Sequence, residues 1–152
     1  MKGSVDKFIQ YATNKKRKTY IDRLVGGRVL AFGQDFNGQL GLGGNINKNN
    51  RGNRNIPTLI PNLNNIVQTS CGSAHSLCLD NKGRVRSFGS NEYGQLGIKR
   101  NADRRRSPDE TNPTTIASLE NIVQVSAGYI HSLCLNNQGR VWSFGVNGAG
   151  QL

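Results

Sequence analysis

Short apolar segments separated by polar turns run through most of the chain, and within them apolar residues alternate with polar ones. Three such segments are IVQTSCG (66–72), HSLCLD (75–80) and RVRSFGS (84–90). Side chains of a β-strand point alternately to opposite faces, so this period of two predicts strands. The segments PTLI (57–60) and PTTI (113–116) add another short strand near the start of each unit.

Turn-forming residues divide these strands. DNKG (80–83) and NNQG (136–139) combine Asn with Gly, which accept the positive φ angles of tight hairpin turns. We therefore expect about four antiparallel strands in each unit.

The whole arrangement recurs along the chain at a constant spacing. Leu63–Leu96 and Leu119–Leu152 share 23 identities in 34 positions. A partial earlier copy, GRVLAFGQDFNGQLG at 27–41, matches GRVRSFGSNEYGQLG at 83–97. Four antiparallel strands at a period of about 50 residues are typical of one β-propeller blade. The predicted fold is all-β: an incomplete β-propeller of antiparallel four-stranded blades with a 56-residue repeat.

His and Cys stand three positions apart twice, at His75 with Cys78 and at His131 with Cys134, which raises the question of a metal site. Residues i and i+3 of a strand point to opposite faces and cannot hold one ion. We therefore interpret the cysteines as small buried apolar groups. Cys71 is included because its repeat equivalent is an alanine, Ala127. The histidines are expected to hydrogen-bond backbone groups at strand starts.

No arrangement for covalent chemistry is found in the sequence. Ser76 and Ser132 follow histidines, but they occupy repeated strand positions without an orienting acid in the unit. The repeat-equivalent Phe32, Phe88 and Phe144 are expected in the core, not as stacking platforms for bases. We therefore expect no catalytic residue, no metal and no cofactor, and we expect that the chain is not an enzyme.

The motifs resemble those of the regulator of chromosome condensation family. GRVxSFG is followed by N-x-x-GQLG, an insertion, a Pro, and then NIVQVSAGxxHSLCL with an xxxGR turn, and the resemblance covers residues 27–152. It implies a propeller of about seven four-stranded blades. This chain, with about two and a half repeats, stops at GAGQL, where both earlier copies continue with Gly41 or Gly97. We expect a fragment, a truncated product or a relic copy.

The repeat predicts the organisation of the chain: a basic arm (1–18), a partial blade (19–42), one blade unit (43–97) and a second unit (98–152), truncated at its end. Remaining blades or self-association are then needed to close the ring. The positions interpreted as building the repeat are Gly33, Gly38, Gly72, His75, Gly83, Gly89, Gly94, Gly128, His131, Gly139 and Gly145.

Charge changes the picture, because 20 Lys and Arg against 9 Asp and Glu give a net charge of +11. Such a chain is attracted to acidic surfaces, whether proteins or nucleic acids. The insertions after GQLG carry cations at one phase of the repeat, and the first of them has no acid nearby in sequence. Candidate macromolecule-binding residues are Lys48, Arg51, Arg54, Lys99, Arg100, Arg104, Arg105 and Arg106; Lys15, Lys16, Arg17 and Lys18 are a candidate nuclear import signal.

Composition also bears on location. Three cysteines without a CxxC pattern fit free thiols in a reducing compartment. The sequence has neither a secretory h-region nor an apolar run long enough, at about 18 residues, to span a membrane. We therefore expect an intracellular protein of the nucleus or cytoplasm, without a membrane partner.

The leading functional hypothesis is a protein-interaction module of a propeller. Two alternatives stay open. The resemblance implies guanine-nucleotide exchange on a Ran-type small GTPase, although no position matches a motif specific for that activity. The basic loops favour chromatin or nucleic-acid association.

Overall fold

The structure is a computed structural model that describes residues 27–44, 52–98 and 109–152. These residues form strands joined by turns, without a helix, so no described helix is long and apolar enough to cross a membrane. The strands are β1 (Leu30–Gly33), β2 (Arg54–Leu59), β3 (Ile66–Cys71), β4 (His75–Asp80), β5 (Val85–Gly89), β6 (Glu110–Thr115), β7 (Ile122–Ala127), β8 (His131–Asn136) and β9 (Val141–Gly145).

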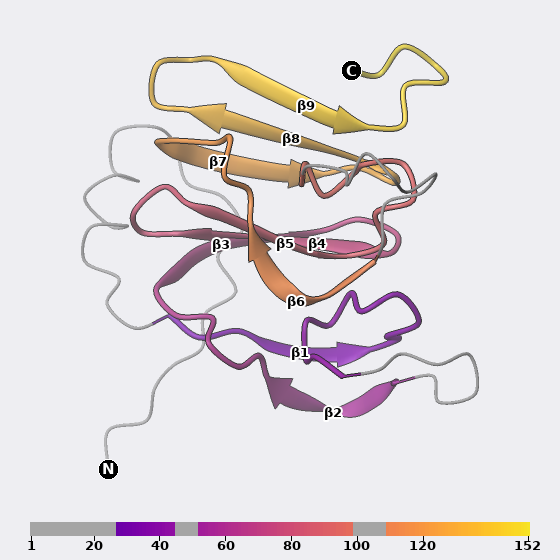
Figure 1. The fold of residues 1–152 in the computed structure, drawn as a ribbon. Coiled ribbons are helices and arrows are strands. Elements are labelled where there is room, and N and C mark those ends of the chain that lie inside the picture. The colour runs from indigo at the N-terminus through magenta and orange to yellow at the C-terminus, as the bar shows by residue number, and fades with distance from the viewer. Residues whose placement is uncertain (1–26, 45–51, 99–108) are drawn as a thin grey trace.

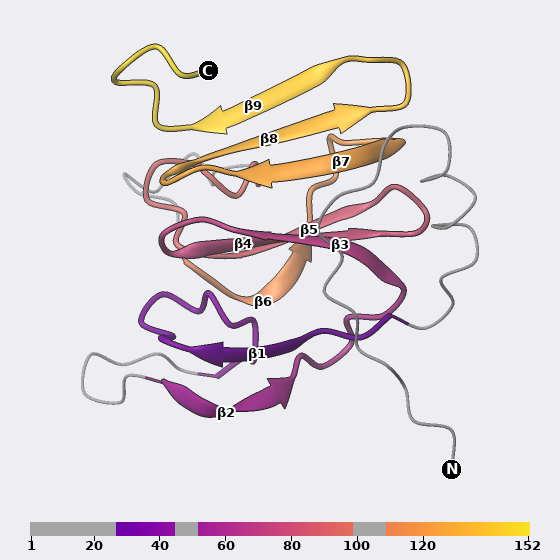
Figure 2. The ribbon, with the colours of Figure 1, turned by 180° about the vertical axis from the view of Figure 1, so that it is seen from behind.

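The strands form three antiparallel sheets that lie one above another (Figures 1 and 2). The first sheet has the order β1-β2, the second β3-β4-β5-β6 and the third β7-β8-β9. The all-β class and the antiparallel four-stranded blade are therefore confirmed, and the stack is not closed into a ring.

The sheets are offset from the sequence units by one strand. β6, which contains the Pro113 motif near the start of unit 98–152, pairs with β5 of the preceding unit. β2 pairs in the same way with β1, so residues 43–97 do not make one sheet. The insertion separates each outer strand from its partner in sequence, and for this reason local periodicity does not reveal the pairing.

The hairpin turns are stabilised by their first side chain. Asp80 Oδ1 accepts hydrogen bonds from the backbone N–H groups of Lys82 (2.9 Å) and Arg84 (3.0 Å). Asn136 Oδ1 does the same for the N–H groups of Gln138 (3.0 Å) and Arg140 (2.9 Å). The two copies thus keep the same turn geometry while exchanging a carboxylate for an amide.

Two apolar clusters lie between the sheets. Strand alternation sends Leu77 and Leu79 of β4 toward the third sheet, where they pack with Ile122 and Val125. Cys78, between them in sequence, packs on the other face, in a cluster with Ile60, Leu63, Ile66 and Phe88. Burying each leucine contributes roughly 1.5–3 kcal/mol, so these clusters hold the sheets together.

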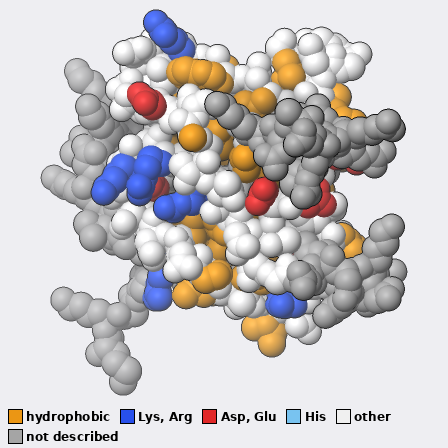
Figure 3. Space-filling view, in the orientation of Figure 1, with side chains coloured by type: hydrophobic (Ala, Val, Ile, Leu, Met, Phe, Trp, Pro, Cys, Tyr) orange, Lys and Arg blue, Asp and Glu red, His pale blue; other side chains and the backbone are white. Residues whose placement is uncertain are grey.

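The outer faces of the stack are open in the described residues. Leu77 and Leu79 are buried, whereas their equivalents on β8, Leu133 and Leu135, are half-buried. Apolar side chains accordingly reach the surface toward both ends of the stack (Figure 3).

The burial of the repeated phenylalanines also depends on which segment packs over each ring. Phe88 is buried under Gly41 of the preceding loop, and Phe144 lies against Gly97 in the same way. Phe32 is exposed, and the prediction that it lies in the core is wrong, because no described loop precedes it to cover the ring.

Candidate functional site

The GQLG loops have a fixed internal geometry. Asp35 Oδ1 accepts the N–H of Leu40 at 2.9 Å, and Asn91 Oδ1 accepts the N–H of Leu96 at 3.1 Å. A glutamine side chain closes the second loop, since Gln95 Oε1 accepts the N–H of Tyr93 at 3.0 Å. Burial raises the pKa of Asp35, although its backbone hydrogen bond and the charge of Arg54 oppose the shift.

Each GQLG loop packs on the next sheet. Ser76 Oγ donates to the carbonyl of Gln39 at 2.8 Å, and Ser132 Oγ donates to that of Gln95 at 2.8 Å. A Cβ on Gly41 would lie 2.8 Å from the Phe88 ring, so this position requires glycine for the close approach. The loop is therefore part of the inter-sheet contact and not a free binding loop.

His75 also joins two sheets. Its Nε2 lies 3.0 Å from Ser132 Oγ, in place of the backbone partner that the sequence suggested. Because Ser132 donates its only hydroxyl proton to Gln95, His75 Nε2 is the donor. Burial, together with the neighbouring His131, lowers the pKa of His75 to about 4, so the imidazole is neutral at physiological pH.

This histidine and serine are not arranged for nucleophilic catalysis. Ser132 is fully buried, and its proton points to a carbonyl and not to the imidazole. His75 Nδ1 is buried without a hydrogen-bond partner among the described residues, so no acid orients the ring. Gly72 lies against the same ring, where a Cβ would collide with it.

The first strands of neighbouring sheets are linked by polar side chains. The carboxamide of Gln68 donates to the carbonyl of Val125 at 2.8 Å and accepts its N–H at 3.1 Å. Ser70 Oγ accepts the N–H of Ala127 at 2.9 Å. These bonds hold β3 and β7 in register.

The His and Cys pairs do not converge on an ion. His75 bonds toward the third sheet, and Cys78 packs toward the first, so the two side chains lie on opposite faces. In the described part of the chain, no three His, Cys, Asp or Glu side chains gather as metal ligands would.

The cysteines divide into two kinds. Cys78 and Cys134 are buried, as predicted, and burial raises the pKa of each thiol to about 12. Cys71 is exposed, and the prediction that it is buried is wrong. Its Sγ lies 3.8 Å from Ser76 Oγ, on the face of β3 turned toward the first sheet, and the described residues of that sheet leave it uncovered.

The glycines of the repeat occupy turns and close contacts. Gly72 and Gly128 lie against histidine rings. The remaining predicted glycines all have positive φ: Gly33, Gly38, Gly83, Gly89, Gly94, Gly139 and Gly145.

Of the predicted macromolecule-binding cations, Arg54 alone falls within the described residues. It begins β2, is exposed, and donates to the carbonyl of Gly52 at 2.8 Å. It has no acid nearby in sequence, but the structure places its charge where it acts on Asp35, which is distant in sequence. The other predicted cations lie outside the described residues: Lys48, Arg51, Lys99, Arg100, Arg104, Arg105, Arg106, and Lys15, Lys16, Arg17 and Lys18 of the candidate import signal.

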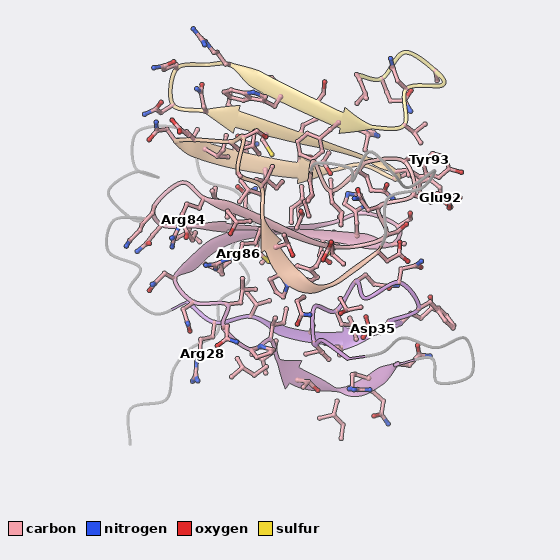
Figure 4. The ribbon with its side chains drawn as sticks, viewed as in Figure 1. Arg28, Asp35, Arg84, Arg86, Glu92 and Tyr93 are labelled. Atoms are coloured by element: carbon pink, nitrogen blue, oxygen red, sulfur yellow. The ribbon has the colours of Figure 1, made fainter. Side chains whose placement is uncertain are left out.

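A second group of cations was missed by the sequence reasoning. Arg28, Arg84 and Arg140 occupy the same position in successive copies of the repeat, and with Lys82 they are all exposed. We call these four residues the hairpin edge. Arg28 and Arg84 lie on the side of the stack opposite Asp35 and Glu92 (Figure 4), where blue side chains gather in Figure 3. The repeated GR dipeptide was the available signal.

The acid that pairs with Arg84 is buried. Arg84 Nε lies 2.7 Å from Asp80 Oδ2, but the Asp80 side chain is 2% exposed and the Arg84 side chain 52%. Arg140 has the neutral Asn136 in the equivalent place. The four residues of the hairpin edge therefore outnumber the one exposed acid that lies beside them in the described part of the chain, Glu120, which precedes the Asn121 that bonds to Asn137.

Stacked antiparallel sheets that share loop-to-sheet contacts define a set of β-propeller blades. The model of the regulator of chromosome condensation (RCC1) repeat matches residues 26–79 and 82–135, and a second model of this repeat matches 66–95 and 122–151. The chain belongs to the regulator of chromosome condensation repeat family, as its motifs indicated.

The relatives that this chain matches are much longer than the chain. The regulator of chromosome condensation of Xenopus laevis is 40% identical over 121 residues, which cover 80% of this chain and 26% of the relative. The probable E3 ubiquitin-protein ligase HERC6 of Homo sapiens is 40% identical over 128 residues, covering 83% of this chain and 12% of the relative. This chain thus spans a minor part of either protein.

Solved structures are similar over much of the chain. Prp20p from Saccharomyces cerevisiae has a TM-score of 0.64 and 27% identity, covering 78% of this chain and 26% of that one. Human WBSCR16 has a TM-score of 0.64 at 23% identity, covering 78% of this chain and 29% of that one, which shows a shared fold.

Proposed function

We propose that the chain is a protein-interaction module that presents the hairpin edge to an acidic surface of a protein partner. The observation that carries this proposal is the recurrence of exposed arginines on successive sheets, with the carboxylate that pairs with Arg84 buried beneath it. Opposite charge steers association and selects partners, even where each exposed ion pair adds little affinity.

The hairpin edge is supported by a rigid scaffold. The carbonyl of Gly27 accepts the N–H of Ile66 at 3.0 Å, and that of Gly83 accepts the N–H of Ile122 at 3.1 Å. Each hairpin is thereby tied to the next sheet, which fixes the spacing of Arg28 and Arg84 before a partner binds. Preorganised groups lose less conformational entropy on association.

Binding to a poly-glutamate peptide, followed by fluorescence anisotropy, tests this proposal. Arg140→Glu should weaken binding severalfold, whereas the matched control Arg54→Glu, with the same charge change away from the hairpin edge, should have a smaller effect. The Arg140 side chain is exposed, and its bonds to Asn136 are made by the backbone N–H and C=O alone, so its replacement leaves the fold intact. Equal weakening by both variants would mean that net charge, and not this edge, governs binding.

Nucleic acid is a second candidate ligand for the same cations. Arginine guanidinium groups suit phosphate, and each phosphate contact contributes about −0.9 to the slope of log K against log salt. A short DNA duplex that binds more tightly than poly-glutamate, with a slope reduced by Arg140→Glu, would favour this alternative.

Nucleotide exchange is the third candidate. It is favoured by the similarity to Prp20p, for which binding to Gsp1p and histones is described. Exchange would proceed by differential binding of the nucleotide-free GTPase, without covalent chemistry. Accelerated release of labelled GDP from a Ran-type GTPase would support it, and an unchanged rate with folded protein would remove it.

A further inference from the structure

Arg86 is a half-buried arginine of β5 whose guanidinium group has no acid paired with it in the described part of the chain. It lies opposite Cys78 of β4 and Thr115 of β6 in the second sheet. Its Nη1 atom is buried without a hydrogen-bond partner among the described residues. A buried charge is unfavourable unless it is paired, so this guanidinium group is suited to an anionic ligand.

Packing does not require an arginine at this position of the repeat. The equivalent residues in the other copies are Leu30 and Trp142, and Trp142 packs against the apolar cluster between the second and third sheets. Burial and the thiol of Cys71 raise the pKa of Cys78, and the charge of Arg86 opposes this shift, so the guanidinium group lies close to Cys78. Arg86 therefore carries a charge beside the apolar cluster that contains Cys78, between the first and second sheets.

The acid on this face of the hairpin is already satisfied. Asp80 Oδ1 accepts two backbone N–H groups of the turn, and Oδ2 pairs with Arg84. The bond from the Asp80 N–H to the Arg84 carbonyl (2.9 Å) continues the strand ladder, so Arg84 and Arg86, two residues apart, face the same side. Both lie toward the side of the stack where Arg28 lies (Figure 4). The neighbouring Thr115 is exposed and adds a hydroxyl-bearing side chain.

We propose that Arg86 binds one carboxylate side chain of the acidic protein partner, between the first and second sheets, with Thr115 and Arg84 beside it. A planar guanidinium group binds a carboxylate through two parallel N–H···O bonds, and one carboxylate balances one unpaired charge. The flexible stem of the arginine allows the group to turn outward, which gives Nη1 a partner.

This inference rests on the function proposed above and adds specificity to it. Arg28, Arg84 and Arg140 recur with the repeat, whereas an arginine at the position of Arg86 occurs in one sheet. Arg86 therefore marks one place along the hairpin edge at which the partner presents an acid.

Arg86→Met separates a role in binding from a role in packing. Methionine keeps an unbranched apolar stem and removes the charge. In the absence of ligand, Arg86→Met should raise the midpoint of thermal unfolding by about 2–4 °C, because an unpaired half-buried charge is replaced by an apolar group. Thermal unfolding followed by circular dichroism measures this shift. An unchanged or lower midpoint would assign Arg86 to the fold and would overturn the proposal.

Binding of poly-glutamate, measured by fluorescence anisotropy at constant ionic strength, tests the site itself. Arg86→Met should weaken binding about tenfold, equivalent to about 1.4 kcal/mol. Arg54→Met, the matched control, removes an exposed arginine away from the site and should have a smaller effect. Arg86→Lys keeps the charge without the planar fork, so its affinity should lie between those of the unmodified protein and Arg86→Met. Equal weakening by Arg86→Met and Arg54→Met would contradict a carboxylate site at Arg86.

The outcomes distinguish this inference from the function on which it rests. An effect of Arg140→Glu without an effect of Arg86→Met would retain the hairpin edge and remove the carboxylate site. The reverse pattern would retain the carboxylate site and contradict the hairpin edge, and no binding of poly-glutamate by the folded protein would remove both. A phosphoserine peptide that binds more tightly than its glutamate counterpart, and that depends on Arg86, would show phosphate recognition and overturn the carboxylate proposal.

Discussion

Replacing Gln68 with alanine removes the side chain that bridges β3 and β7 by two hydrogen bonds to the backbone of Val125. A half-buried hydrogen bond contributes about 0.5–1.5 kcal/mol, so Gln68→Ala should lower the free energy of unfolding by about 1–3 kcal/mol. With a urea m-value of about 2 kcal/mol per molar, the unfolding midpoint should fall by about 1 M. Urea denaturation followed by circular dichroism measures this shift.

Gln124 provides the matched control, because it is the repeat equivalent of Gln68 on the outermost sheet. Its side chain is exposed, and no partner for it lies among the described residues. Gln124→Ala should change the free energy of unfolding by less than about 0.5 kcal/mol. Equal destabilisation by the two variants would refute the reasoning, because it would assign the effect to strand propensity and not to the bridge between sheets.

Three further predictions concern burial. The pKa of His75 is lowered to about 4 from an ordinary 6.5, so the unfolded chain binds more protons between these pH values, and the free energy of unfolding should decrease as pH falls from 6.5 toward 4. In urea titrations at several pH values, His75→Gln should show a weaker pH dependence than the unmodified protein. An unchanged dependence would contradict the prediction. Leu77→Ala should lower the free energy of unfolding by about 2–5 kcal/mol, and Leu133→Ala, at the half-buried equivalent position, should lower it clearly less. Equal losses of stability in thermal unfolding would argue against an open outer face on the third sheet. A thiol reagent should modify Cys71 alone in the native protein and all three cysteines in urea, because Cys78 and Cys134 are buried and the pKa of each thiol is raised. Rapid modification of a second cysteine in the native protein would contradict this prediction.

Much of the local structure could be predicted from the sequence. Alternation in HSLCLD and RVRSFGS predicts strands where β4 and β5 lie, and the Asn-Gly turns predict the hairpins, because both signals depend on neighbouring residues. The opposite orientation of His75 and Cys78 also follows from the alternation of side chains along a strand.

The candidate site was less predictable. The basic insertions could be predicted as binding loops because their charges are close together in sequence. The cations of the hairpin edge come from successive copies of the repeat, far apart in sequence. Arg54 had no acid nearby in sequence but lies close enough to Asp35 to affect its pKa. Charge interactions depend on distance in space, and distance along the chain does not provide it.

The sequence by itself determined the repeat, the strands, the tight turns and the family, since these are encoded in the period and in residues a few positions apart. Only the tertiary structure decided that β6 completes the preceding sheet, that His75 meets the hydroxyl of Ser132, and that Val141 stays exposed where Val85 is buried. The physical reason is that nearly identical strands acquire different environments from whatever packs beside them, and that neighbour is brought there by the fold.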